Sequence, residues 1–445
     1  MLLDDRDCSG QLCWQENVLN IDFDLSCAND GTIKLKLKDI PFGKDVLWLH
    51  ELFHKEKRYF EFLQLNGSDG KGNSITSNSV IFNSLGNRSD TAGSWISPEG
   101  TCMQLQINSA KPLTYDKTRV ILVRYRLLGF ECFGRLVGKT DFGSVEVAGS
   151  TKIENYDEVT GVLTIKVQPD RSFDLTTWLA ICDISVRSIL DILSLANDSY
   201  IAWTCRDLFY DESWMSSFLI GSRRSGRPSQ PLFTYLNLQP ILNLALTNYS
   251  EDLKQKTGLD VAIEWFLIKS TYDEVKLLTV MTALEHLVYV YAEQKERGTI
   301  FKNDIFKNIV TPQVKAALDQ SLELLLENKE DANKRKSYPD KVKSAKNKIT
   351  EINRYPFKEN LWEFLKKHKV PLDGIEQDIE PAVNARHQIV HRGMYISGGS
   401  TQSVNDHLAV LRELLNRIFL TLLKYNGEYQ SFLNGPEWKE FSPFH

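Results

Sequence analysis

The spacing of apolar residues differs between the two ends of this chain, and the difference limits the folds that the chain can adopt. From Leu19 to about Gln168, apolar residues recur at every second position, as in Ile33 to Lys38, where they alternate with lysines. This period is typical of strands that bury one face. From about Leu236 onward they recur every three or four positions, the period of amphipathic helices. Strands that precede helices in this way predict an α+β fold.

The amino-terminal part, residues 1–173, is predicted to be an antiparallel β-sandwich-like domain. Residues 119–125 and 161–167 are rich in β-branched side chains, and Asn66-Gly67 suits a turn that needs positive φ. Residues 73–90 are rich in serine and asparagine, which predicts a loop and short edge strands. Because such modules are more often recognition platforms than catalysts, we expect a sensing or regulatory role.

Residues 174–235 are predicted to connect the two parts. We expect a helix over residues 174–196, with Asp174 or Thr176 as its N-cap, and two short strands over residues 200–220. The following loop has no acid and three arginines, Arg223, Arg224 and Arg227. It is either a solvated linker or a loop that binds RNA phosphates. In the second case each phosphate contact would make the affinity for RNA more dependent on salt without adding sequence specificity.

The carboxyl-terminal part, residues 236–445, is predicted to be a helical bundle. Its expected helices span residues 241–256, 259–269, 272–295, 311–327, 360–369, 371–395 and 404–425. Residues 328–347 are crowded with lysine and arginine, which favours a solvated connection over a packed element, or else a basic shoulder for an RNA backbone.

Length, charge and cysteine usage narrow the class of protein. At 445 residues the chain is long enough for two or three domains, and its net charge of −5 means that any nucleic-acid surface must be a local patch. No run of about 18 apolar residues occurs, which predicts no membrane-spanning helix. The acidic start, Met1 to Asp7, differs from a secretory signal, so we expect a cytoplasmic protein. The cysteines all precede residue 206 without a C-x-x-C pair, which indicates reduced thiols.

The stretch Arg386-His387-Gln388-Ile389-Val390-His391 places a charge where an apolar residue is expected. Counting about 100° per residue from Ile379, the apolar stripe of this helix is Ile379, Ala382, Val383, Ile389 and Val390. Arg386 falls in the middle of that stripe. Because an unpaired buried charge costs several kcal/mol, Arg386 needs a carboxylate, a phosphate or a partner subunit opposite it. Glu285 lies on the edge of the apolar stripe of the 272–295 helix, and we predict a contact between the two.

The same helix carries a polar edge that suits proton transfer. His387 and His391 are one helical turn apart, and Asn384 lies on the same side. Histidine titrates near neutrality, and arginine offers fixed donors for phosphoryl oxygens. Arg386 and His391 are about 140° apart around the helix, so both are able to flank one groove.

Arg386 and His391 match the R-x4-6-H signature of HEPN domains, with a spacer of four residues, and His387 matches the polar residue often found after the arginine. Ala283-Leu284-Glu285-His286-Leu287 resembles the glutamate-bearing helix of ApeA-like HEPN proteins, whose β-rich and then helical layout is also similar. The resemblance implies a metal-independent endoribonuclease without a cofactor, with Arg386 and His391 as catalytic residues. His387, Asn384 and Glu285 would support them.

The resemblance also implies partners and a biological role. HEPN nucleases dimerise so that two motifs share one cleft, so we expect a homodimer that cleaves RNA. ApeA-like proteins act in bacterial defence, where an RNase held silent is released on phage infection and halts growth. The β-rich part would then sense a phage-derived trigger, and no membrane is involved.

Four other readings of the sequence remain open. In one reading, Arg386 only caps a helix or forms an ion pair within the bundle. In another, the bundle is a non-catalytic sensor that binds RNA or a nucleotide without cutting it. His387 and His391 hold a metal, although no third ligand is evident. His50-Glu51-Leu52-Phe53-His54 fits the H-E-x-x-H pattern of zinc metalloproteases.

The metalloprotease pattern is incomplete in this chain. Lys57 and Phe60 stand where its extended form has glycine and histidine, and the neighbouring sequence is strand-like. A remote ligand, Glu61 or Glu99, stays possible, but the sequence favours surface histidines at positions 50 and 54.

Overall fold

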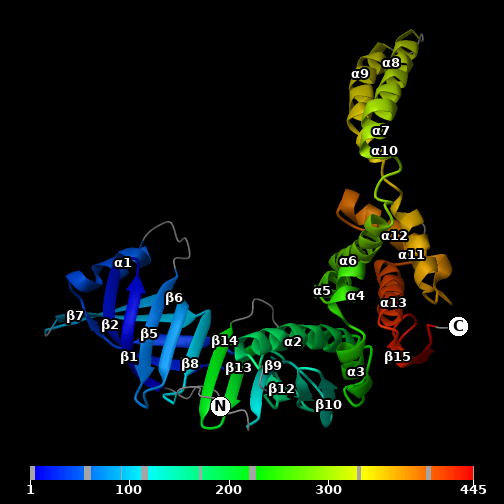
Figure 1. Cartoon of the computed structure of the whole chain (residues 1–445). Coiled ribbons are helices and arrows are strands. Elements are labelled where there is room, and N and C mark those ends of the chain that lie inside the picture. The colour runs from blue at the N-terminus through cyan, green and yellow to red at the C-terminus, as the bar shows by residue number, and fades with distance from the viewer. Residues whose placement is uncertain are drawn as a thin grey trace. The chain divides into compact units, whose positions relative to one another are not determined.

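The computed structural model describes residues 6–54, 62–91, 93–111, 119–169, 173–219, 227–327, 332–396 and 402–443. The chain divides into two compact units, Met1–Thr247 and Asn248–His445. Antiparallel strands dominate the first unit and helices the second, which confirms the α+β class (Figure 1). The helical unit begins at Asn248, later than the residue 236 predicted for it.

Six strands of the first unit close into an antiparallel barrel. They pair in the cyclic order β1, β2, β3, β7, β6, β5 and back to β1. Their bounds are β1 (Arg6–Trp14), β2 (Asn17–Cys27), β3 (Ile33–Leu37), β5 (Leu63–Asp69), β6 (Ser74–Asp90) and β7 (Gly93–Cys102). The alternation of apolar and polar residues puts one set of side chains inside, as in β3, where burial alternates residue by residue. Phe23, Leu25 and Leu65 lie in this core, together with Val46 and Leu49. These two belong to the short elements next to β4 (Ile40–Pro41), namely η1 (Lys44–Val46) and α1 (Leu47–His54).

Strand β6 corrects the prediction of a loop with short edge strands at residues 73–90, because it is one continuous strand of 17 residues. Its first residues, Ser74 to Thr76, pair with β8 (Gln104–Asn108), and its later residues pair with β7. The chain passes from β7 to β8 at Met103, whose backbone N–H donates to the carbonyl of Ser79 at 2.9 Å. One strand therefore belongs both to the barrel and to the sheet that β8 begins.

That second sheet is open, with the order β10-β11-β12-β9-β13-β14-β8. Its other strands are β9 (Ile121–Leu128), β10 (Arg135–Thr140), β11 (Gly143–Ala148), β12 (Val159–Val167), β13 (Ala202–Tyr210) and β14 (Ser213–Leu219). A closed barrel joined to an open sheet thus replaces the predicted two-layered sandwich. The two strands expected over residues 200–220 are confirmed as β13 and β14.

Helix α2 (Leu175–Asn197) lies along the open sheet (Figure 1) and is followed later by α3 (Gln239–Thr247). The predicted N-cap is confirmed, because Asp174 accepts a hydrogen bond from the backbone N–H of Thr177 at 2.8 Å. Trp178 donates from its indole nitrogen to the carbonyl of Phe142 at 2.8 Å, which anchors the start of α2 to the sheet. The elements predicted as a connecting segment therefore belong to the first unit.

The second unit is built around α6 (Asp273–Gln294), which contacts α4, α5, α11, α12 and α13. Its predicted apolar stripe, from Leu277 to Tyr291, is buried. Contrary to the expectation from sequence, α6 has the length and hydropathy of a membrane span, although 56% of that stretch is buried within the structure. The other helices are α4 (Glu251–Thr257), α5 (Leu259–Phe266), α7 (Asn303–Ile305), η2 (Phe306–Val310), α8 (Thr311–Glu327), α9 (Ala332–Asn347), α10 (Ile349–Ile352), α11 (Phe357–His368), α12 (Glu376–Arg392) and α13 (Val404–Leu422).

Three features differ from the prediction for this part of the chain. The helix expected over residues 241–256 is divided at residues 248–250 into α3, which belongs to the first unit, and α4. The lysine-rich segment forms α9, which packs side by side with α8, where Lys346 pairs with Asp319 (Figure 1). The chain also ends in a hairpin of β15 (Gly427–Ser431) and β16 (Glu437–Phe441), so the unit is not entirely helical.

Candidate functional site

Helix α12 presents the motif residues at the surface of the second unit. Its buried face consists of Ile379, Ala382, Val383, Ala385 and Ile389. Val390 was predicted on this face but is 51% exposed. The helix ends at Gly393, whose φ of +77° suits glycine and stops the helix two residues after His391.

Arg386 forms the predicted contact with Glu285 on α6. Its Nη2 atom lies 3.1 Å from one carboxylate oxygen of Glu285 and 3.2 Å from the other. The two side chains are 30% and 33% exposed, so the pair sits at the rim of the bundle rather than in its core. Burial raises the pKa of Glu285, and the charges of Arg386 and His387 act against that rise.

The two motif histidines touch each other beside this ion pair. The rings of His387 and His391 lie 5.1 Å apart between centroids, nearly perpendicular, and both residues are exposed. Because the charge of His387 also acts on Glu285, the structure brings Glu285, Arg386, His387 and His391 into one cluster. Asn384 is exposed on the same helix, and within the described residues it makes no contact with this cluster.

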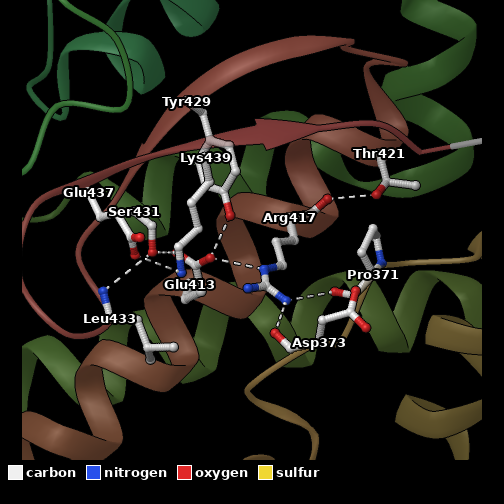
Figure 2. Close-up of polar contacts among 10 residues, drawn as sticks. All are labelled: Pro371, Asp373, Glu413, Arg417, Thr421, Tyr429, Ser431, Leu433, Glu437 and Lys439. Atoms are coloured by element: carbon white, nitrogen blue, oxygen red, sulfur yellow. Dashed lines mark hydrogen bonds and ion pairs between the residues drawn. The ribbon is translucent and has the colours of Figure 1, made fainter. Parts of the chain in front are cut away.

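A buried polar network holds the start of α12 in place (Figure 2). Glu413 on α13 accepts hydrogen bonds from Arg417 Nε at 2.9 Å, from the Tyr429 hydroxyl at 2.6 Å and from the Ser431 hydroxyl at 2.9 Å. Arg417 in turn donates from Nη1 to the carbonyls of Pro371 at 3.2 Å and Asp373 at 2.9 Å. The ion pair of Glu413 and Arg417 on α13 thus links the hairpin that contains β15 to the turn that leads into α12.

A second set of contacts holds α12 against α13. Gln402 donates to Asp378 near the start of α12 at 2.9 Å. Past the end of α12, the hydroxyl of Tyr395 lies 2.9 Å from Nε2 of His407 on α13 and donates to the carbonyl of Gln402 at 3.1 Å. His407 is 3% exposed, and burial lowers its pKa.

Arg223 and Arg224 lie outside the described residues, and Arg227 is exposed in the first unit.

The H-E-x-x-H residues lie on α1, a helix of only eight residues, where the His50 ring packs edge-on against Phe42 at 5.7 Å. Throughout the described parts of the chain, no three His, Cys, Asp or Glu side chains are placed to hold a metal ion.

Glu413 and Arg417 are the supporting residues that the sequence prediction missed. Their signal is an acid and a base four residues apart on a helix rich in leucine, a spacing that allows the two side chains to pair, as they do here. No protein-family model, curated protein or solved structure matches this chain.

Proposed function

We propose that the protein is a metal-independent endoribonuclease of the HEPN type, with Arg386 and His391 as its catalytic residues. The observation that carries the proposal is the cluster at the rim of the second unit. An arginine held by Glu285 stands beside two exposed, touching histidines on α12. Neither Arg386 nor His391 is sealed in the bundle, so both are accessible to a phosphodiester.

The residue types suit cleavage by the 2′-hydroxyl of RNA. A base takes the 2′-hydroxyl proton as the 2′-oxygen attacks phosphorus, and an acid protonates the departing 5′-oxygen, which leaves a 2′,3′-cyclic phosphate and a 5′-hydroxyl. We assign one of these proton transfers to His391; a positioned acid or base contributes roughly 10²- to 10⁴-fold in rate. We assign Arg386 to the charge that develops on the phosphoryl oxygens, with His387 and Asn384 orienting the substrate.

A homodimer would supply the second histidine that two proton transfers need. Large apolar side chains are exposed next to the cluster, one helical turn beyond each member of the ion pair. Val390 follows Arg386 on α12 and is 51% exposed, and Tyr289 follows Glu285 on α6 and is 58% exposed. Met394, past the end of α12, is 55% exposed. Burial of these side chains against a twin subunit would face the two motifs toward each other.

The resemblance to ApeA-like proteins extends the proposal to a cytoplasmic effector that halts the growth of phage-infected bacteria. In that role the first unit would respond to a phage-derived trigger. Expression of the wild-type chain should then be toxic, and expression of His391→Ala should be tolerated.

One observation favours a second candidate, a binding module that holds RNA or a nucleotide uncut. Both carboxylate oxygens of Glu285 engage the same nitrogen of Arg386, so a phosphate must share the guanidinium with an acid. An arginine neutralised in this way still binds but stabilises a developing charge less.

Incubation of the full chain with total RNA in excess chelator tests the proposal. We expect fragments with 2′,3′-cyclic phosphate and 5′-hydroxyl ends, and we expect Arg386→Ala and His391→Ala each to abolish them. Matched controls are Arg392→Ala, next to His391 and exposed, and His286→Ala, whose ring lies against Gly258. Cleavage that survives both catalytic substitutions, or that the chelator stops, contradicts the nuclease. RNA binding without cleavage, weakened by Arg386→Ala, supports the binding module.

A further inference from the structure

The first unit contains a cavity of about 350 Å³, whose lining residues all belong to that unit. Strands β6, β8, β13 and β14 line it on one side, and α2 lines it on the other through Asp183 and Arg187. Its lining is mixed in character, with two arginines, one carboxylate, several amides and hydroxyls, and one indole. Its volume falls at the lower end of the roughly 300–1,000 Å³ found for ligand pockets, and its lining is more polar than is usual for them, which favours a polar ligand.

The sheet side of the cavity is a row of polar side chains that the strand register places on one face. Arg206 on β13 is paired with Ser217 on β14, Ser217 with Gln106 on β8, and Gln106 with Thr76 on β6. Directly paired residues of antiparallel strands point to the same face of a sheet. All four residues line the cavity. The row presents a guanidinium, two hydroxyls and an amide toward α2.

A β-bulge adds an aromatic ring to this row. In β13 the register to β9 shifts between Trp203 and Cys205, so Thr204 is an extra residue. Residues three apart on a regular strand point to opposite faces, but one extra residue between them puts Trp203 and Arg206 on the same face. The ring of Trp203 lies 5.4 Å from that of Tyr125, the residue paired with Arg206, and Trp203 lines the cavity.

The charge in the cavity is positive on balance. Both oxygens of Asp183 are already engaged, one by the hydroxyl of Tyr125 at 2.6 Å and the other by Nη1 of Arg206 at 2.5 Å. The Nε atom of Arg206 is buried and has no hydrogen-bond partner among the described residues. Arg187, one turn after Asp183 on α2, is exposed and has no acidic partner in the described part of the chain. The lining therefore carries two guanidinium groups but only one carboxylate, and that carboxylate is paired with Arg206.

We propose that this cavity binds a small phosphorylated ligand of mononucleotide size. Arg187 and the donors of Arg206 not used by Asp183 hold the phosphate, because a guanidinium fork matches its oxygens. Trp203 offers a ring face to a base, and Gln106, Ser217 and Thr76 bond to the polar edge of the ligand. The site is independent of the proposed RNA cleavage and would give the first unit a ligand to sense.

Isothermal titration calorimetry of the full chain with AMP, GMP, CMP and UMP tests this site. We expect saturable binding of at least one mononucleotide and no comparable binding of the matching nucleoside, which lacks the phosphate. Arg187→Ala should weaken that binding about tenfold or more, since it removes a charge-assisted contact. Arg187 is exposed on α2, so this change should leave the fold intact.

Two further variants locate the binding. Arg135→Ala removes an exposed arginine on β10 that pairs with Glu146, away from the cavity, and should bind like wild type. Arg386→Ala should also bind like wild type, which separates this site from the cluster on α12. The proposal is overturned if none of the four mononucleotides binds at millimolar concentration, if Arg187→Ala binds as tightly as wild type, or if Arg386→Ala abolishes binding.

Discussion

Replacement of Glu413 by alanine should destabilise the second unit more than most single substitutions. The carboxylate is 1% exposed and the guanidinium of Arg417 is 6% exposed, so the change leaves a buried charge without its counter-charge. Removal of one partner from such a pair costs about 3–5 kcal/mol. The hydroxyls of Tyr429 and Ser431 also lose their acceptor. A loss of about 4 kcal/mol is a large share of the roughly 5–15 kcal/mol that stabilise a folded protein.

Hydrogen exchange of the α13 amides in the full chain measures this loss, because their slowest exchange reports the unfolding of the unit that contains them. We expect exchange about 10³-fold faster in Glu413→Ala than in wild type, the factor that corresponds to about 4 kcal/mol. Glu428→Ala, an exposed carboxylate in the same hairpin, should change little. The double variant Glu413→Leu with Arg417→Met should recover part of the loss, since it buries no charge but still leaves the hydroxyls of Tyr429 and Ser431 without their acceptor. A change below about 1 kcal/mol in Glu413→Ala would refute the reasoning, because that is the range of an exposed ion pair.

Three smaller effects follow from other contacts. In a double-mutant cycle of Glu285→Gln and Arg386→Gln, the coupling in unfolding free energy should be about 1 kcal/mol, because both side chains are about a third exposed; a coupling near zero contradicts the contact. Burial holds the pKa of His407 below its ordinary 6.5. On acidification His407 is therefore protonated in the unfolded chain before it is protonated in the folded chain, which favours unfolding. The contribution of neutral His407 to the free energy of unfolding is complete above pH 6.5 and decreases as the pH falls below 6.5. Thermal melts should therefore show a shallower loss of Tm on acidification in His407→Asn than in wild type, and equal slopes would count against this. Ser403→Ala removes the serine half of the capping box of α13 and should cost about 1 kcal/mol in urea unfolding, whereas Ser403→Thr, which keeps the hydroxyl, should retain most of the cap.

The sequence predicts those elements whose pattern is local. Helix α2 combines a helical period with Asp174 as cap, and both are confirmed. Strand β6 was missed because Ile75 and Val80 are its only fully buried apolar residues and a buried serine stands between them. Helix α9 was missed because its lysines and Pro339 suggest solvated chain, whereas contacts with α8 hold it as a helix. Tertiary packing, absent from the local pattern, decides such segments.

The candidate sites also include features that the local sequence predicts and features that it does not. A charge inside an apolar stripe needs a partner, and this rule found the contact of Arg386 with Glu285. The rotation count placed Val390 on the buried face, but its side chain is 51% exposed. The cavity in the first unit was beyond reach, because the row from Arg206 to Thr76 depends on the register of four strands that are far apart in sequence.

The double membership of β6 has a practical consequence for dissecting the protein. Its early residues hydrogen-bond to β5 on one side and to β8 on the other. If the chain were cut between the barrel and the open sheet, the fragment without β6 would keep a strand edge whose backbone N–H and C=O groups have lost their partners. Unpaired strand edges of this kind pair with other chains and cause aggregation. Fragments cut there should precipitate, and the first 247 residues are the smallest piece of this region to express intact.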